Sequence, residues 1–509
     1  MGNPWTRMFV LCGLLSFSTV LADEPSSKEK PPKADEAEKP KDEFRTTHHS
    51  VTIGGTSVKY TAVAGTLVLK EEDGTSKASV FYVAYTRDGA GDRSARPVTF
   101  SFNGGPGSSS VWLHLGVLGP RRVLLDDEGT PPPPPYRLID NAYSLLDVTD
   151  LVFIDPVSTG YSRVVPQEAE PKEFHGVRED IESVGEFIRL YTTRNRRWSS
   201  PKFLIGESYG TTRAAGLAGH LQERHGMYLN GVMLVSSILE FQTARFDPGN
   251  DVPYVLFLPT YAATAWYHEQ LPADLQQRAL REVLDEVEAF ATEEYATALM
   301  RGATLPEADR QRVAARLARY TGLSEDYVDR ANLRVGIMRF VKELLREERR
   351  TVGRLDSRFT GIDRDAAGES FDYDPSYAAI QGPYTATLNA YVREDLEFES
   401  DLPYEILTGR VRPWNYAPYQ NQYLNVAETL REAMTQNPHL RVLVANGYYD
   451  LATPYFATEH TFNRLPLDSS LRGNLTMTYY EAGHMMYIHR PSLETLKADL
   501  ERFVVEAAR

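Results

Sequence analysis

The feature that most constrains this chain is a series of short, uninterrupted apolar runs, each followed by loop residues. The runs occupy residues 98–102, 150–154, 202–205, 231–235, 441–445 and 475–480. Apolar runs of this length are typical of strands that are buried on both faces of a mostly parallel sheet. Segments with helical periodicity, such as residues 177–191, lie between them. The order of elements therefore predicts an α/β fold.

Two other regions have different patterns. Upstream of residue 98 the sequence alternates like antiparallel strands, at residues 50–53, 58–63, 65–69 and 78–85. Between residues 239 and 423 helical periodicity takes over, most clearly at residues 273–299, 307–320 and 324–346. We interpret this region as a helical cap inserted into an α/β domain of residues 46–238 and 424–509. The alternative is that these helices only add packing surface.

The first 45 residues have the features of a targeting segment and a tether. Arg7, an apolar stretch at residues 8–15 and the small residue Ala22 predict a signal peptide over residues 1–22. The apolar stretch is too short to span a bilayer, although an uncleaved membrane anchor is the alternative. Residues 23–45 are expected to form a disordered linker, because almost all of them are charged, Pro, Ser or Ala. We therefore expect a secreted or periplasmic protein without stable membrane insertion.

Composition narrows the classes of partner and the source of stability. The only cysteine, Cys12, lies in the predicted signal peptide, so the mature chain would have no disulfide and would depend on its core. The net charge of −15 argues against a nucleic-acid partner. We interpret the acidity as an aid to solubility, with a preference for basic or neutral substrates as the alternative.

The strongest local motif is Gly206-Glu207-Ser208-Tyr209-Gly210. It follows the predicted strand at residues 202–205 and precedes a helix-compatible run at residues 212–218. A serine on a sharp strand-to-helix turn needs very small residues two positions away on each side, and the two glycines meet that need. The context predicts the nucleophile elbow of an α/β-hydrolase, with Ser208 as the nucleophile.

A glycine-rich loop, residues 103–110, follows the predicted strand at residues 98–102. Such a loop can direct backbone N–H groups at one point. Together with the amide of Tyr209, the amide of Gly105 is expected to form an oxyanion hole that stabilises the charge developing on a carbonyl oxygen. An ordinary tight turn is the alternative interpretation.

A serine nucleophile requires a base, and the base requires a partner that fixes its tautomer. Asp450 and His484 each follow a predicted strand, at residues 441–445 and 475–480, and they come after Ser208 in the chain order that this fold uses. Polar residues beyond the carboxyl ends of strands are where open α/β sheets place their sites. We therefore predict a triad of Ser208, Asp450 and His484.

These motifs together resemble those of the serine carboxypeptidases. The resemblance is carried by residues 103–110 (Asn-Gly-Gly-Pro-Gly-Ser-Ser-Ser), 155–162, 206–210 and 483–485 (Gly-His-Met), in the family's order. It implies an α/β-hydrolase that removes single residues from peptide C-termini through an acyl-enzyme. It also implies that Asn103 and Glu207 hold the substrate's terminal carboxylate, with Glu207 protonated, and that Met485 helps to form the pocket for the leaving residue.

The chain departs from the family pattern at three positions. Ser101 and Val117 stand where members have Trp and Glu, and Ser108 replaces a cysteine, as in a bacterial-type member without disulfides. The first two changes keep a related esterase or acyltransferase, or a non-catalytic peptide-binding protein, as alternatives to a carboxypeptidase. We expect a peptide partner and neither cofactor nor metal, because His220 and Glu223 match only a fragment of a zinc motif.

Overall fold

A computed structural model describes residues 40–509, which form one unit. The predicted signal peptide and the linker up to residue 39 lie outside the described residues. Strand β1 begins at Glu43, so the last three residues of the predicted linker belong to the sheet instead. No helix within residues 40–509 combines the length and the apolar character needed to cross a bilayer.

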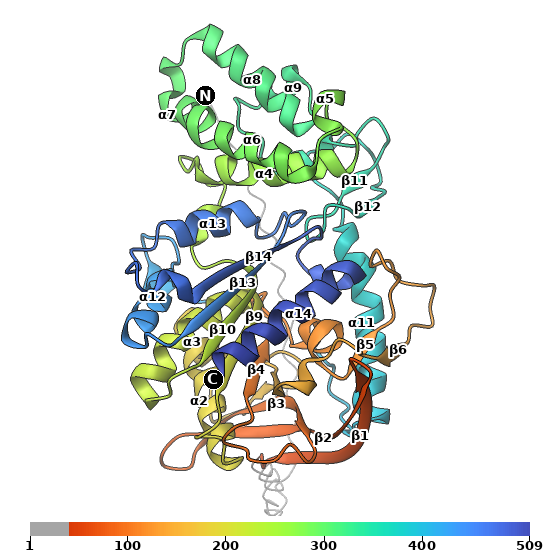
Figure 1. Ribbon diagram of the computed structural model, residues 1–509, viewed down its shortest axis with the longest axis vertical. Coiled ribbons are helices and arrows are strands. Elements are labelled where there is room, and N and C mark those ends of the chain that lie inside the picture. Colours follow the sequence, from red (N-terminus) through yellow and green to blue (C-terminus); the bar gives the residue numbers. More distant parts are fainter. Residues whose placement is uncertain (1–39) are drawn as a thin grey trace, which may run out of the picture. The chain divides into compact units, whose positions relative to one another are not determined.

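The core of the fold is a ten-stranded sheet with the order β1-β2-β3-β7-β4-β9-β10-β13-β14, in which β8 also pairs with β3 (Figure 1). Its strands are β1 (Glu43–Ile53), β2 (Thr56–Lys70), β3 (Ser76–Arg87), β4 (Val98–Phe102), β7 (Asp150–Ile154), β8 (Arg163–Val164), β9 (Lys202–Ser208), β10 (Gly231–Ser237), β13 (Arg441–Gly447) and β14 (Leu475–Tyr480). Strands β1 to β3 are antiparallel, and β3 is antiparallel to β7. From β7 to β14 all pairings are parallel. The predicted mixed α/β sheet is confirmed.

Helices cover both faces of this sheet. Consecutive residues of a strand point to opposite faces, so a strand that is apolar throughout needs cover on both. In β9, Phe203 and Ile205 enter one apolar core and Leu204 enters the other. The first core is covered by α11 (Pro375–Glu394) and α14 (Arg490–Ala507), and the second by α2 (Val177–Arg194), α3 (Tyr209–His225) and α12 (Ala427–Gln436). The short elements are α1 (Val111–Leu113), β5 (Arg121–Val123), β6 (Leu138–Asp140), β11 (Thr351–Val352), β12 (Thr360–Gly361) and α13 (Tyr455–Asn463).

A helical region follows β10 and has a third apolar core of its own. In Figure 1 it lies on the side of α13 that faces away from α12 and α3. Its helices are α4 (Val252–Tyr267), α5 (Ala273–Gln276), α6 (Leu280–Phe290), α7 (Ala296–Arg301), α8 (Glu307–Thr321), α9 (Glu325–Arg330) and α10 (Ile337–Glu343). We call residues 239–352, which contain most of this core, the helical insertion.

The structure differs from the sequence prediction in two details of this region. The expected helix at 273–299 is interrupted by a π-helical turn, Ala291–Tyr295, and the expected helix at 324–346 breaks where Asn332 and Leu333 adopt positive φ. Helix α11 lies within the predicted cap, residues 239–423, yet Tyr384 and Leu388 pack into a core of the main sheet. The last part of the predicted cap therefore folds with the sheet.

Candidate active site

Ser208 ends strand β9 and directly precedes helix α3, so the predicted strand and helix are both present. Its backbone is strained, with φ 60° and ψ −131°. A Cβ at Gly206 would lie 2.2 Å from the carbonyl oxygen of Gly210, so a side chain has no room there. The close approach of these two glycines is what allows the turn to lift the Ser208 side chain off the sheet.

The loop after β4 packs directly against this turn. A Cβ at Gly104 would lie 2.4 Å from the backbone nitrogen of Tyr209. The N–H of Gly105 donates to no acceptor among residues 40–509. Tyr209 is the first residue of α3, and the first N–H groups of a helix have no intrahelical partner. The N–H groups of Gly105 and Tyr209 therefore lie in neighbouring segments and have no backbone acceptor among residues 40–509.

Asp450 and His484 form a buried pair beside Ser208. His484 Nδ1 lies 2.8 Å from Asp450 Oδ2. Asp450 is fully buried and accepts hydrogen bonds from the N–H groups of Ala452 and Thr453. Burial lowers the pKa of His484, but the charge of Asp450 and its hydrogen bond outweigh burial and raise that pKa above its ordinary value. This arrangement fixes the ring and makes it a better proton acceptor.

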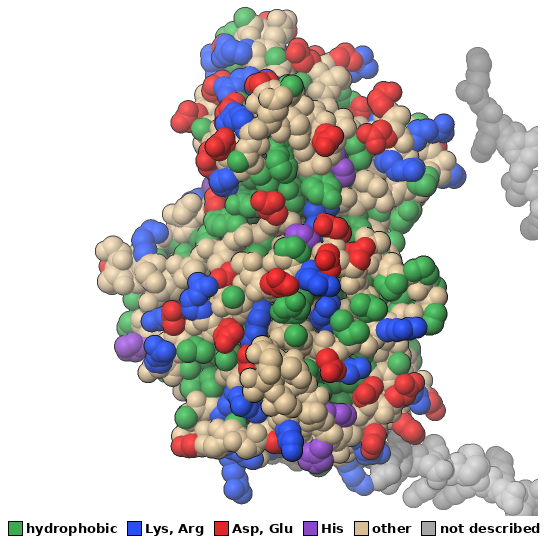
Figure 2. All heavy atoms as spheres, turned by 45° about the vertical axis from the view of Figure 1, so that its right-hand side comes forward, with side chains coloured by type: hydrophobic (Ala, Val, Ile, Leu, Met, Phe, Trp, Pro, Cys, Tyr) green, Lys and Arg blue, Asp and Glu red, His purple; other side chains and the backbone are tan. Residues whose placement is uncertain are grey.

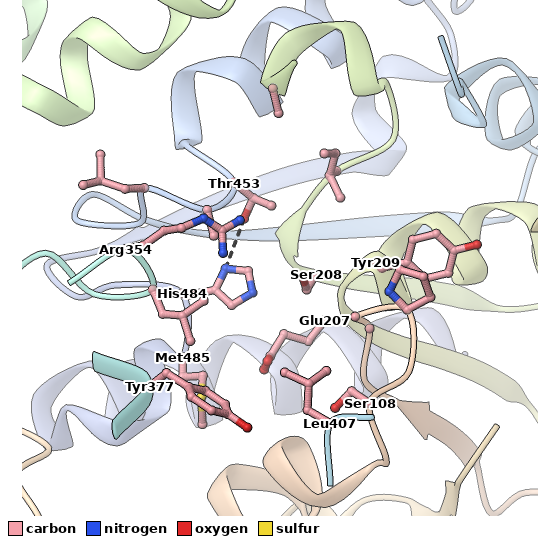
Figure 3. Close-up of a pocket in the computed structure, with 18 of the residues that line it drawn as sticks. Ser108, Glu207, Ser208, Tyr209, Arg354, Tyr377, Leu407, Thr453, His484 and Met485 are labelled. Carbon is pink, nitrogen blue, oxygen red and sulfur yellow. Dashed lines mark hydrogen bonds between the residues drawn. The ribbon is translucent and has the colours of Figure 1, made fainter. Parts of the chain in front are cut away.

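Ser208 and His484 face the same cavity in Figure 3, and no hydrogen bond joins their side chains in this structure. Catalytic hydrogen bonds are often long before substrate binds. The backbone around His484 is held from three sides: its N–H donates to Leu355 O at 2.6 Å, its carbonyl accepts from Ser236 Oγ, and the N–H of Gly483 donates to Asp356 Oδ2. Sequence reasoning missed Leu355 and Asp356, because they reach the site from a distant part of the chain.

Glu207 is a buried carboxyl on the floor of the same cavity. Burial raises its pKa to about 7, against the opposing charge of His484. The hydroxyl of Tyr487 donates a hydrogen bond to Glu207 Oε2. The sequence analysis missed Tyr487, and its place three residues after His484 was the only available signal.

Asn103 is buried near Glu207, and only one end of its side-chain amide has a hydrogen-bond partner. Its Oδ1 accepts the N–H of Leu113 at 3.1 Å, while its Nδ2 has no partner among the described residues. Its backbone carbonyl accepts from Arg213, a buried side chain that also pairs with Asp180. The loop is thus rigidly held, with one buried amide donor left unused.

The three departures from the family pattern are all buried. Ser101 and Val117 have no exposed surface, and Ser101 Oγ lacks a hydrogen-bond partner among the described residues. Ser108 Oγ donates to the carbonyl of Ser109 and accepts from Trp112 Nε1 at 2.9 Å. Hydrogen bonds thus tether the loop through Ser108.

The cavity itself has a volume of about 800 Å³, within the range of ligand pockets. Gly105, Ser208, Tyr209 and Glu207 line it together with His484 and Met485. Figure 3 shows Met485 and Tyr377 on the His484 side and Tyr209 on the other side of Ser208. Asp450 lies behind His484 and does not line the cavity.

Comparisons with known proteins show the family of the chain. A family model described as serine carboxypeptidase matches residues 56–488. The crystal structure of KEX1(delta)p, a prohormone-processing carboxypeptidase from Saccharomyces cerevisiae, is similar, with a TM-score of 0.56 and 17% identity over 88% of this chain and 91% of that one. A proline iminopeptidase from Mycobacterium smegmatis also matches, at 14% identity over 91% of this chain and 99% of that one, with a TM-score of 0.34. The chain is a hydrolase that belongs to the serine carboxypeptidase family.

Proposed function

We propose that the protein removes C-terminal residues from peptides through an acyl-enzyme intermediate. The observation that carries this proposal is that Ser208, His484, Gly105, Tyr209 and Glu207 line one cavity, while Asp450 and Asn103 are buried behind its lining. Each group has the chemistry that one step of such a reaction needs.

In the proposed reaction, Ser208 Oγ attacks the last peptide carbonyl while His484 accepts the hydroxyl proton. The amides of Gly105 and Tyr209 stabilise the resulting oxyanion. His484 then gives the proton to the leaving nitrogen as the C–N bond breaks, and the shortened peptide remains as an ester on Ser208. Water, deprotonated by His484, hydrolyses that ester. Asp450 orients the ring and stabilises its charged form throughout.

The buried floor would restrict cleavage to the chain end. Asn103 Nδ2 makes no close hydrogen bond among the described residues and lies near Glu207, so it would donate to an oxygen of the substrate's terminal carboxylate. Glu207 in its protonated form would donate to the same carboxylate, whereas the ionised form would repel it. Tyr487 would hold Glu207 in place from the opposite side. An internal peptide bond offers no carboxylate to these groups.

We also propose that the protein is exported. Residues 1–22 as a signal peptide and residues 23–45 as a linker would deliver the enzyme out of the cytoplasm, to the periplasm or the medium. We expect an exporting host to cleave the chain after Ala22. The N-terminal sequence of the mature protein measures this.

The test is to incubate the protein and its Ser208→Ala variant with N-blocked peptides that end in a free carboxylate or an amide, and to read the products by mass. We expect stepwise shortening of only the peptides that end in a free carboxylate. In Ser208→Ala the rate of shortening should fall by about 10⁴-fold or more. Ser199→Ala, an exposed serine, is the matched control and should behave like the parent. Cleavage of simple esters with every peptide left intact would favour the related esterase instead.

A further inference from the structure

The cavity wall carries more positive charge than the proposed reaction uses. Arg245, Arg354 and Arg412 all line it, whereas Glu207 is the only carboxyl residue among the described residues that does. Because burial keeps Glu207 largely neutral up to about pH 7, it cancels little of this charge. The cavity therefore has the opposite sign to the chain, whose net charge is −15.

These three arginines also lack ordinary partners. No hydrogen bond or ion pair joins any of their guanidinium groups to another residue in the range 40–509, although Arg245 stacks on the ring of Phe241. Many arginines outside the cavity pair with acids, as Arg334 does with Asp251, and the face drawn in Figure 2 shows basic and acidic side chains interspersed. Unpaired guanidinium groups around one cavity are available for a ligand.

Arg354 is the best placed of the three. Arg245 and Arg412 are exposed, so solvent screens their charge, whereas Arg354 is partly buried. Its backbone is fixed at both ends: its N–H donates to Asp374 Oδ1, and its carbonyl accepts the N–H of Leu451, the residue after the catalytic acid of the proposed triad. Its guanidinium thus extends from a rigid base.

Figure 3 shows on which side of the nucleophile this group lies. Arg354 is next to His484, on the same side of Ser208 as Met485 and Tyr377 and away from Tyr209. Because His484 must pass a proton to the leaving nitrogen, the leaving residue lies on this side of Ser208. The side chain of the leaving residue is therefore the part of the substrate that Arg354 can contact.

We propose that Arg354 is a specificity residue that selects peptides whose C-terminal residue has an acidic side chain, glutamate or aspartate. A guanidinium can bind a carboxylate through two parallel hydrogen bonds, which favours planar acids over amides. Arg245 and Arg412 attract acidic peptides in general but, being exposed, do not select the last residue. The proposal rests on the carboxypeptidase function proposed above, and it replaces the preference for basic or neutral substrates that the acidic composition left open.

The experiment uses four N-blocked peptides that differ only in the last residue: Glu, Gln, Leu or Lys. The ratio of kcat/KM for Glu over Gln is measured at pH 7 for the parent, Arg354→Gln, Arg354→Lys and Arg312→Gln. Arg312 is an exposed arginine of α8 outside the cavity and serves as the matched control. Active enzyme is counted by labelling Ser208 with a fluorophosphonate, so that partial misfolding does not alter the ratio.

We expect the parent and Arg312→Gln to prefer Glu over Gln by about fivefold to tenfold, with Lys cleaved most slowly. The ratio should fall to about one in Arg354→Gln, because an amide cannot replace the charge, and should partly survive in Arg354→Lys. A parent ratio near one, or a ratio that persists in Arg354→Gln, overturns the assignment while carboxypeptidase activity stands. If no peptide is shortened in a Ser208-dependent way, the proposed function fails and this inference fails with it.

Discussion

The parallel sheet and the region between β10 and α12 contribute to the site in different ways. The sheet places Ser208, Asp450 and His484 at or just beyond the carboxyl ends of β9, β13 and β14, with β10 between the first two strands. The intervening region supplies Leu355 and Asp356, which bind the backbone at His484, and the free guanidinium of Arg354. In the proposed mechanism the sheet would therefore carry the chemistry, and the intervening region would position His484 and contact the substrate.

The two regions also differ in how they are stabilised. The larger part of the intervening region is the helical insertion, whose own apolar core includes Tyr261 and Phe340, stacked with ring centroids 4.0 Å apart. Its core joins the sheet through Tyr449, Leu451 and Tyr455, which flank Asp450 in sequence. The insertion therefore contacts the loop of the catalytic acid without supplying any member of the proposed triad.

The sharpest test of the sheet's role is Asp450→Asn. The amide keeps the shape of the carboxyl but removes the charge that raises the pKa of His484 and fixes its tautomer. We expect kcat for peptide cleavage to fall by about 10⁴-fold, as in related triads, while thermal unfolding shows a folded protein. Asp468→Asn, at an exposed loop, is the control. A loss of less than tenfold would remove Asp450 from the triad.

The complementary test addresses the insertion. Phe340→Ala deletes a fully buried ring and should lower the free energy of unfolding by about 3–4 kcal/mol, the usual cost of such a cavity. In native buffer, hydrolysis of a small ester at Ser208 should change little, because Phe340 does not line the cavity. Urea unfolding and ester hydrolysis measure the two effects separately. Ester hydrolysis lost in parallel with stability would contradict the division of roles between the two regions.

The same division explains what the sequence could predict. Ser208, Asp450 and His484 lie just after apolar runs, and glycines such as Gly206 mark the close backbone contacts, so local patterns were sufficient to find them. Arg354 has no local signal, because its position depends on contacts with residues about 100 positions away, such as Leu451. The sequence analysis also assigned α11 to the cap, since helical periodicity does not say which core a helix joins.

The smallest expected effect concerns Glu207, which lies on the sheet side of the cavity. Its pKa is raised to about 7, so the carboxyl is neutral below that pH and ionised above it. The neutral form can donate to a substrate carboxylate and the ionised form repels it, so KM should rise about tenfold between pH 6 and pH 8. Burying the ionised form is also unfavourable, so stability should fall as the pH rises from the ordinary range of a glutamate through 7.

Glu207→Gln separates this effect from the titration of His484. Glutamine donates at every pH, so KM in the variant should be nearly independent of pH, while the fall of kcat/KM toward acid pH, where His484 becomes protonated and cannot accept a proton, should remain. Initial rates across pH 5–9, with one N-blocked peptide whose side chains are uncharged, give the pH dependence of both KM and kcat/KM. If the rise in KM persists in Glu207→Gln, another group senses pH at the terminal carboxylate and the role proposed for Glu207 is wrong.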